Sequence, residues 1–156
     1  KLTPEAVAAK LAEFVHGEHG AKPSALSLSQ ATELGSVYSP AEIAALTVMA
    51  HKAGMKCHMD GARFANALVH LGCTPAEMTW QSGIDVLSFG GTKNGAMILE
   101  AVVFFDPKLA EGWMWIGLAH RKGNRFAEAR QALQKAKALN PERLWIQQQL
   151  EKTPAQ

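Results

Sequence analysis

The sequence predicts an α/β fold over its first two thirds, followed by an all-helical segment. Up to about residue 106, short apolar runs typical of strands alternate with helices that carry clear start signals. Beyond that point no strand pattern remains, and helical spacing continues to about residue 150. Strands that alternate with helices of this length are typical of a parallel sheet with right-handed crossovers. The length of 156 residues and the 47% apolar content fit one globular domain with a small appendage.

Three expected helices begin with Ser or Thr followed by Pro, which is the usual signal for an N-cap and a first helical residue. The first is expected over residues 4–15, with Thr3 as its N-cap. The other two add a glutamate three residues after the cap, which completes a capping box, and they are expected over 40–53 and from Pro75. A further helix is expected over 62–70.

Four strands are expected, over residues 25–29, 55–59, 85–89 and 101–105. We interpret the last two as buried because they are apolar and rich in Val and Phe. In parallel sheets, ligands bind just beyond the carboxyl ends of the strands. Asp60 directly follows the second strand, and Lys93 follows the third in a glycine-rich loop. The sequence therefore predicts a carboxylate and an amine at one edge of the sheet.

Simpler interpretations of both residues remain open. Asp60 also fits the N-cap of a helix that starts near Ala62, and Lys93 also fits an ordinary solvated loop lysine. The Gly-Gly-Thr-Lys segment does not have the residue order of a Walker phosphate loop. The pair together favours pyridoxal-phosphate chemistry, which needs a lysine amine for a Schiff base and an acid for the protonated ring nitrogen.

Three segments make the chain similar to a known family. They are residues 28–39 (LSQATELGSVYS), 58–67 (HMDGARFANA) and 88–95 (SFGGTKNG). Together they resemble the low-specificity L-threonine aldolases, which are fold-type-I pyridoxal-phosphate enzymes of the β-eliminating lyase group. The resemblance spans residues 2–106 and includes the spacing between the segments. It implies part of a PLP-transferase-like large domain, with a mainly parallel sheet of about four strands.

The resemblance also implies roles for individual residues. Lys93 would bind pyridoxal 5'-phosphate covalently and take part in proton transfer, and Asp60 would hold the pyridinium nitrogen. Arg63 would contact the phenolic oxygen of the cofactor or the carboxylate of an amino-acid substrate, and Gln30 would sit near the ring. The reaction implied is the cleavage of a β-hydroxy-α-amino acid, such as threonine, to glycine and an aldehyde.

Two parts of the family pattern have no counterpart in this sequence. The phosphate-binding loop and the histidine that stacks on the ring lie upstream of anything present here, and we interpret His16 and His19 as surface residues. The small C-terminal domain of the family, which supplies an arginine for the substrate, is also missing. We therefore expect a truncated chain with weak or no aldolase activity.

The second segment has the spacing of a single tetratricopeptide (TPR) repeat over residues 110–143, with a further helix over 144–150. Its pattern residues are Trp113, Ile116, Gly117, Ala119, Phe126, Ala129, Leu133, Ala136 and Pro141. An unrelated helical hairpin would show similar core spacing. Because one repeat cannot bury its apolar face alone, Trp113, Trp115 and Trp145 are expected to need a partner surface.

These patterns predict two domains, residues 1–106 and 107–156, joined as a chimera. The alternative function is then that of a non-catalytic protein-interaction module, which binds a peptide or forms a homo-oligomer through the helical segment.

Charge and composition exclude several other classes of protein. The first domain carries seven Lys or Arg against ten Asp or Glu, and the second nine against four. The basic charges of the second are spread around its helices, so we expect no nucleic-acid binding. No apolar run is long enough for a membrane span, and no signal peptide is visible. Cys57 and Cys73 form neither a disulfide framework nor a metal motif, which predicts a cytoplasmic protein without a metal.

Overall fold

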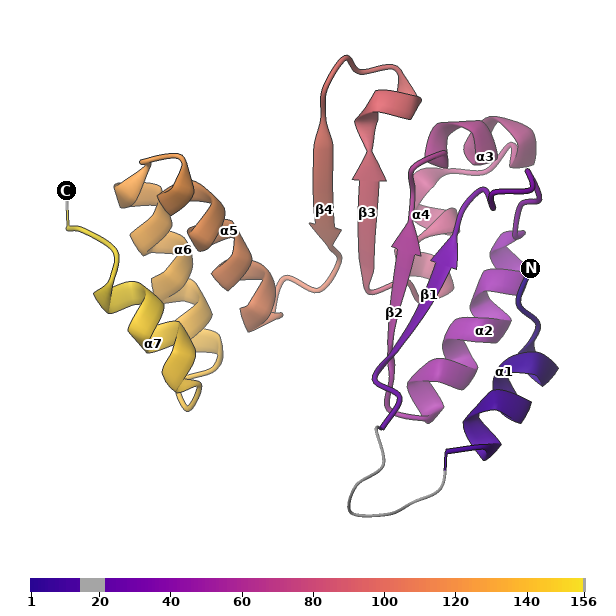
Figure 1. The fold of residues 1–156 in the computed structure, drawn as a ribbon, viewed down its shortest axis with the longest axis horizontal. Helices are drawn as coiled ribbons and strands as arrows, with labels where there is room; N and C mark the ends of the chain where they lie inside the picture. The colour runs from indigo at the N-terminus through magenta and orange to yellow at the C-terminus, as the bar shows by residue number, and fades with distance from the viewer. Residues whose placement is uncertain (15–21, 156) are drawn as a thin grey trace. The chain divides into compact units, whose positions relative to one another are not determined.

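The computed structural model describes residues 1–14 and 22–155, and its chain divides into two compact units (Figure 1). The first unit is Lys1–Phe105 and the second is Asp106–Gln156. His16 and His19, interpreted above as surface residues, lie outside the described residues.

The first unit is an α/β structure, as the sequence predicts. Its elements in chain order are α1 (Pro4–Ala12), β1 (Ala25–Ser29), α2 (Pro40–Lys52), β2 (Lys56–Asp60), α3 (Phe64–Leu71), α4 (Pro75–Met78), the 3-10 turn η1 (Trp80–Ser82), β3 (Val86–Gly90), the 3-10 turn η2 (Gly91–Asn94) and β4 (Glu100–Phe104). The strands form one sheet in the order β1-β2-β3-β4. The first three strands are parallel, and β4 is antiparallel to β3.

The helix starts follow the local signals in the sequence. Thr3 caps α1 by accepting a hydrogen bond from the amide of Ala6. Both reciprocal hydrogen bonds of the capping box are present in α2, with Ser39 as cap, and in α4, with Thr74 as cap. Each box satisfies backbone donors that a helix would otherwise leave unpaired at its first turn.

The expectation of a buried last strand is wrong. β4 is an edge strand, with 60% of Val102 and 37% of Val103 exposed. Only residues 91–99 separate it from β3, whereas a parallel crossover needs a dozen residues or more. The chain therefore turns back on itself, and the apolar residues of β4 reflect strand propensity rather than burial.

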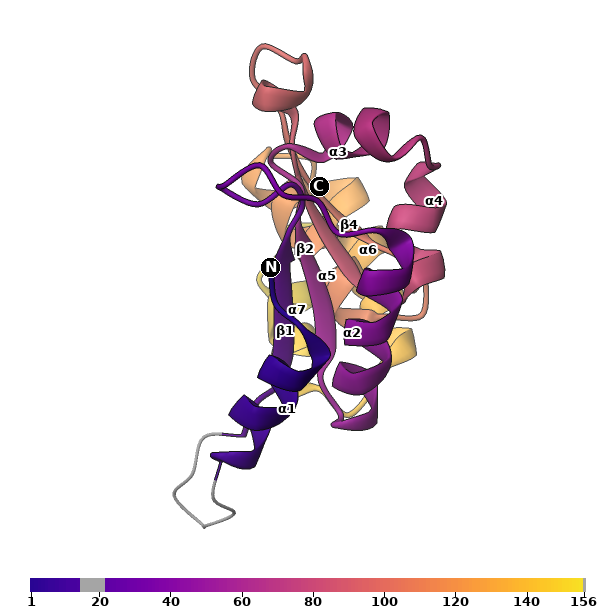
Figure 2. The same cartoon turned by 90° about the vertical axis from the view of Figure 1, so that its right-hand side faces the viewer.

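The two faces of the sheet differ in chemistry. One face carries the core residues Leu26, Leu28, Cys57, Met59 and Leu87, and helices α2, α3 and α4 lie on one side of the strands (Figure 2).

The opposite face is polar along β1 and β2. There His58 joins three strands, with 2.8 Å from its Nδ1 to Ser27 Oγ and 2.9 Å from its Nε2 to Ser88 Oγ.

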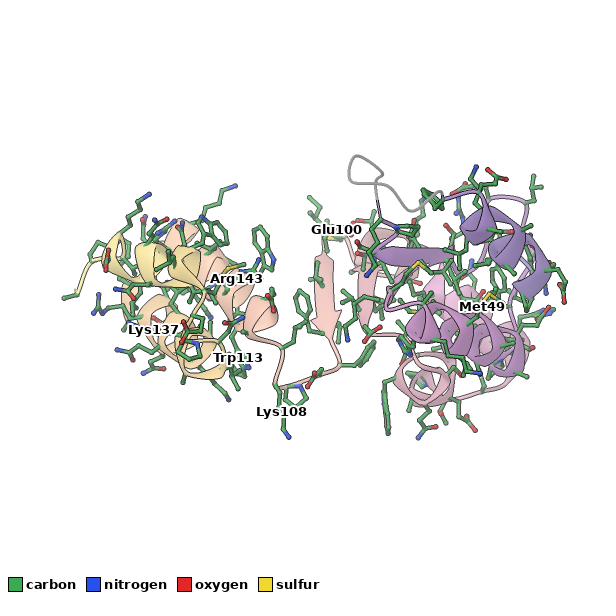
Figure 3. All side chains as sticks on the ribbon, turned by 90° about the horizontal axis from the view of Figure 1, so that it is seen from below. Met49, Glu100, Lys108, Trp113, Lys137 and Arg143 are labelled. Carbon is green, nitrogen blue, oxygen red and sulfur yellow. The ribbon has the colours of Figure 1, made fainter. Side chains whose placement is uncertain are left out.

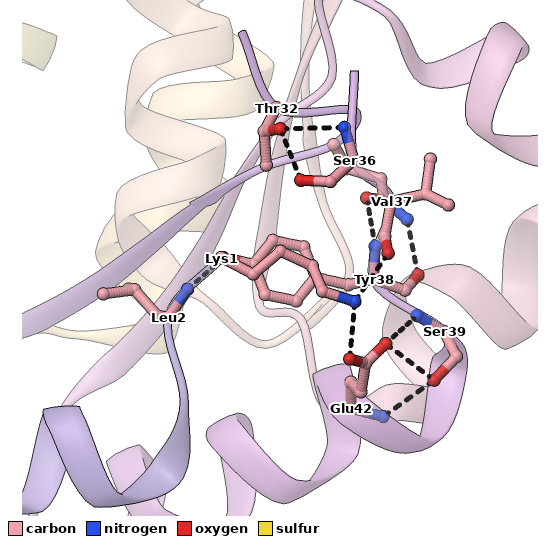
Figure 4. A network of polar contacts seen from close by, with 9 residues as sticks. Lys1, Leu2, Thr32, Ser36, Val37, Tyr38, Ser39 and Glu42 are labelled. Carbon is pink, nitrogen blue, oxygen red and sulfur yellow. Dashed lines mark hydrogen bonds and ion pairs between the residues drawn. The ribbon is translucent and has the colours of Figure 1, made fainter. Parts of the chain in front are cut away.

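A polar network fixes the segment that leads from β1 to α2 (Figure 4). The Tyr38 hydroxyl accepts a hydrogen bond from the amide of Leu2 at 2.7 Å. The Lys1 ammonium contacts both the Val37 carbonyl, at 2.9 Å, and the Glu42 carboxylate of the α2 capping box. Contact with Lys1 and with the Ser39 amide lowers the pKa of Glu42 to about 2.

At the other end of the sheet, Asp85 joins α2 to β2 and β3. Its carboxylate accepts hydrogen bonds from the Cys57 amide and His51 Nε2, both at 2.8 Å, and from Lys56 Nζ at 3.0 Å. Burial acts to raise the pKa of Asp85, but these three partners outweigh it, so the pKa lies below its ordinary value.

The second unit consists of α5 (Ala110–Lys122), α6 (Phe126–Leu139) and α7 (Leu144–Glu151). Its core residues are Ala110, Met114, Leu133, Ala136 and Ile146. The assignment of this unit to the tetratricopeptide repeats stays a prediction, as do the predicted domain limits. None of the helices in residues 1–14 and 22–155 has the length and apolarity that crossing a membrane requires.

The tryptophans of the second unit have different environments. Trp113 donates from Nε1 to the Pro107 carbonyl at 2.9 Å, and Lys135 Nζ lies 3.8 Å from the centre of its ring. Trp113 is thus held by contacts within its own unit. Figure 3 shows Trp113 and Arg143 on that unit. Trp115 and Trp145 pack edge to face at 6.2 Å, yet 54% and 40% of them remain exposed.

Candidate active site

A cavity of about 230 Å³ lies at the carboxyl ends of β2 and β3, the edge at which the sequence predicts a site. Its lining residues come from the end of β2 and the loop after it, from β3 and η2, and from the start of β4: Asp60, Ala62, Ser88, Gly90, Thr92, Lys93 and Glu100. Both residues on which the sequence argument depends therefore line one cavity. They come from segments 33 residues apart that parallel strand pairing brings to the same edge.

Asp60 is the last residue of β2, and its carboxylate is partly engaged. Oδ1 accepts a hydrogen bond from the amide of Ala62 at 3.0 Å. Within the described residues, no hydrogen bond to Oδ2 is formed. The alternative role of Asp60 as a helix N-cap is wrong, because α3 begins only at Phe64, two residues later than expected, and Arg63 precedes it.

Lys93 lies in η2, at the start of the connection that turns from β3 into β4. The amide of Gly91 donates to the Leu99 carbonyl at 2.7 Å, and the amide of Ala96 donates to the Gly91 carbonyl at 3.0 Å. A Cβ at Gly91 would lie 2.6 Å from the Leu99 Cβ, so this approach of the two strands requires glycine. Lys93 thus has an exposed side chain, while two backbone hydrogen bonds hold the turn on which it lies.

Arg63 is engaged beside the cavity rather than lining it. Its guanidinium donates two hydrogen bonds to the Glu33 carboxylate, at 3.0 and 2.8 Å. The hydrogen bond and charge of Arg63, with a smaller contribution from Lys93, lower the pKa of Glu33. Glu33 in turn raises the pKa of Arg63, and the Asp60 charge adds to that effect. Two carboxylates and two cations therefore interact at this edge.

Gln30 does not reach the cavity. It is fully buried, and its side chain amide donates to the Tyr38 carbonyl at 2.8 Å and accepts from the Tyr38 amide at 3.0 Å. The expectation that Gln30 lies near a cofactor ring is not met, because its polar atoms serve the turn between β1 and α2.

Sequence reasoning missed two acidic residues of the site, Glu33 and Glu100. Glu33 lies within the first of the three segments of family resemblance, and Glu100 begins β4. No local sequence pattern marks either residue, because each reaches the site only through tertiary contacts. Glu33 does so through its ion pair with Arg63, and Glu100 through the pairing of β3 with β4.

The cavity suits the reactive part of pyridoxal phosphate. It holds an amine and a carboxylate with a free oxygen, and Gly90 leaves its wall open, since a Cβ there would lie 3.2 Å from the Ala62 Cα. The charge of the lining is less suited to a phosphate group, because Asp60 and Glu100 face the single amine of Lys93. The residues therefore fit the ring and aldehyde ends of the cofactor, and the phosphate requires other groups.

Known proteins resemble this chain. The sequence profile of the β-eliminating lyase family matches residues 1–146, which extends beyond residue 106 into the helical unit. The low-specificity L-threonine aldolases of Pseudomonas sp. (strain NCIMB 10558) and Pseudomonas aeruginosa are 52% and 49% identical over 111 residues. That region is 71% of this chain and 32% of each relative, so the chain spans about a third of their length.

A solved structure shows the same fold. The threonine aldolase of Leishmania major superposes with a TM-score of 0.60 and 21% sequence identity, over 97% of this chain and 43% of that one. At this identity the likeness concerns the fold alone. With the family profile matched over most of its length, the chain belongs to the β-eliminating lyases.

Proposed function

We propose that this chain is part of a pyridoxal-phosphate-dependent lyase that cleaves β-hydroxy-α-amino acids, such as threonine to glycine and an aldehyde. Membership in the β-eliminating lyases implies dependence on this cofactor. The observation that carries the proposal is that Lys93 and Asp60 line one cavity, in a chain that is 52% and 49% identical over 111 residues to two relatives named as threonine aldolases.

When bound, the cofactor supplies an electron sink that stabilises the negative charge left on the substrate α-carbon after the bond from Cα to Cβ breaks. Asp60 would keep the ring nitrogen protonated through its free oxygen Oδ2. The Ala62 amide holds Oδ1 and so fixes the direction in which Oδ2 points. This arrangement matters because a protonated ring nitrogen makes the ring the stronger electron acceptor.

Lys93 would have two tasks. Its Nζ would bind the cofactor covalently between turnovers. Once displaced by substrate, the amine would take up a proton, such as the one that the β-hydroxyl group releases on cleavage, and as an ammonium it would return that proton to the substrate α-carbon. An exposed side chain on a fixed backbone suits both tasks, because the amine has to move while its origin stays in place.

Arg63 would bind the phenolic oxygen of the cofactor or the carboxylate of the substrate. In the chain without ligands its guanidinium is bidentate with Glu33, so an incoming carboxylate has to replace Glu33 or share Arg63 with it. Because 76% of the Glu33 side chain is exposed, this ion pair is weak enough to exchange.

The test measures the uptake of pyridoxal phosphate by the 156-residue chain and three variants. Uptake is detected through the visible absorbance of the bound cofactor. We expect Lys93→Ala to abolish the absorbance of the lysine-bound cofactor and Asp60→Asn to weaken binding about tenfold, which corresponds to one charge-assisted hydrogen bond. Lys52→Ala, at an exposed lysine of α2, is the matched control and should bind like the unchanged chain. Equal uptake by all four proteins would contradict the proposal.

A second candidate function, as a protein-interaction module, is favoured by the half-exposed pair of Trp115 and Trp145. Light scattering over a range of concentrations tests it for self-association. Association that is lost in Trp115→Ala but kept in Trp80→Ala, an exposed tryptophan of the first unit, would support it. A monomer at every concentration would leave no support for self-association.

A further inference from the structure

We propose that Asn94 is a positioning residue, whose side chain amide clamps the loop that follows Asp60 to the turn that carries Lys93. The inference rests on the proposed function only in so far as Asp60 and Lys93 act together on one ligand. The clamp itself is a property of the chain's own hydrogen bonds.

The donor side of the amide holds two loops. Asn94 Nδ2 lies 3.1 Å from the carbonyl oxygen of Gly61 and 3.3 Å from that of Ala62, both in the loop directly after Asp60. It also donates to the Gly90 carbonyl, at 2.7 Å, at the end of β3. Since Asn94 is the immediate neighbour of Lys93, one side chain ties the Lys93 backbone to the Asp60 backbone.

The acceptor side of the same amide caps a helix. Asn94 Oδ1 accepts a hydrogen bond at 2.8 Å from the amide of Ala65, in the first turn of α3. Arg63, at the N-cap position, provides no side-chain cap for that helix. Asn94 therefore does from 29 residues away what the local Ser39 and Thr74 do for α2 and α4.

No other side chain of similar size meets both requirements. The site presents carbonyl oxygens on one side and an N–H group on the other, which matches the two ends of a primary amide. Aspartate would keep the acceptor for Ala65 but lose the donors to the loop after Asp60. Alanine would lose both, and the two substitutions therefore separate the helix cap from the clamp.

The experiment measures amide hydrogen exchange in the 156-residue chain with Asn94→Ala and Asn94→Asp. Two amides report on the site: that of Ala62, which donates to Asp60 Oδ1, and that of Ala96, which donates to the Gly91 carbonyl. We expect about tenfold faster exchange at both in either variant, since each loses the contacts of Nδ2 with the Gly61, Ala62 and Gly90 carbonyls. The Ala65 amide should exchange faster in Asn94→Ala only. Asn66→Ala, at an exposed asparagine of α3, is the matched control.

A second measurement reports on the chemistry. Borohydride trapping of pyridoxal phosphate should give about tenfold less adduct at Lys93 in both variants, with unchanged labelling of other lysines. Exchange that changes at Ala65 alone, with Lys93 trapped as before, would make Asn94 a helix cap only and overturn the clamp. If the unchanged chain traps nothing at Lys93, the proposed function fails, while the Ala62 and Ala96 amides still decide whether the clamp exists.

Discussion

At the scale of single residues, the candidate site combines charges of opposite sign, of which one pair is fully engaged. Arg63 is held by Glu33, while Asp60 keeps one oxygen free and Lys93 lies exposed. The sequence predicts Asp60 and Lys93 as neighbours because both follow strands whose carboxyl ends share an edge. It does not predict Glu33, because no spacing rule connects that residue to Arg63, 30 positions later.

Asp85 is the residue whose charge matters most for stability at the opposite end of the sheet. Because its pKa in the folded chain lies below the ordinary value, it stabilises the fold above about pH 4, the pKa of an unfolded chain's aspartate, and this contribution is lost as the pH falls further. Asp85→Asn should therefore lower the free energy of unfolding by about 1–3 kcal/mol at pH 7.

Urea unfolding at pH 7 and pH 3 measures this effect. The difference between Asp85→Asn and the unchanged chain should be smaller at pH 3, which lies below the pKa of about 3.9 for aspartate in an unfolded chain, because protonation then stabilises the unfolded state. Glu100→Gln, at an exposed carboxylate, is the control and should differ little at either pH. A difference that stays constant from pH 7 to pH 3 would show that the carboxylate charge is not involved.

At the scale of elements, local signals are sufficient for some helices and insufficient for others. The capping boxes predict the starts of α2 and α4 because cap and partner lie three residues apart in sequence. The sequence predicts the start of α3 two residues too early, because the side chain that caps this helix is Asn94, far along the chain. The burial of β4 is misjudged for a different reason: its composition is that of a buried strand, but the short connection before it makes it an antiparallel edge strand.

The turn from β3 into β4 depends on the close approach of Gly91 to Leu99. Gly91→Ala would place a Cβ 2.6 Å from the Leu99 Cβ and 2.8 Å from its carbonyl oxygen, so the strands would have to separate. We expect this change to lower the free energy of unfolding by about 1–3 kcal/mol. Thermal unfolding of Gly91→Ala beside Thr92→Ala, at an exposed residue of the same turn, measures it, and equal midpoints would refute the steric argument.

At the scale of the whole molecule, the sequence identifies the fold class and the family over its first two thirds. It does so because three segments together resemble the family in residues and spacing, and the sheet brings two of them to one cavity. The family profile extends to residue 146, well into the helical unit that we predict to be a separate domain. The origin of that unit therefore stays a prediction, while membership of the chain in the family does not depend on it.

The central claim is that the carboxyl ends of β2 and β3 bring together a working lysine and its acidic partner. The most direct measurement is titration of the chain with pyridoxal phosphate, followed by borohydride reduction and peptide mapping. We predict an adduct concentrated on Lys93, reduced when Asp60 is replaced by asparagine. An adduct spread evenly over the exposed lysines, or unaffected by Asp60→Asn, would contradict the claim that the carboxyl ends of β2 and β3 form an active site.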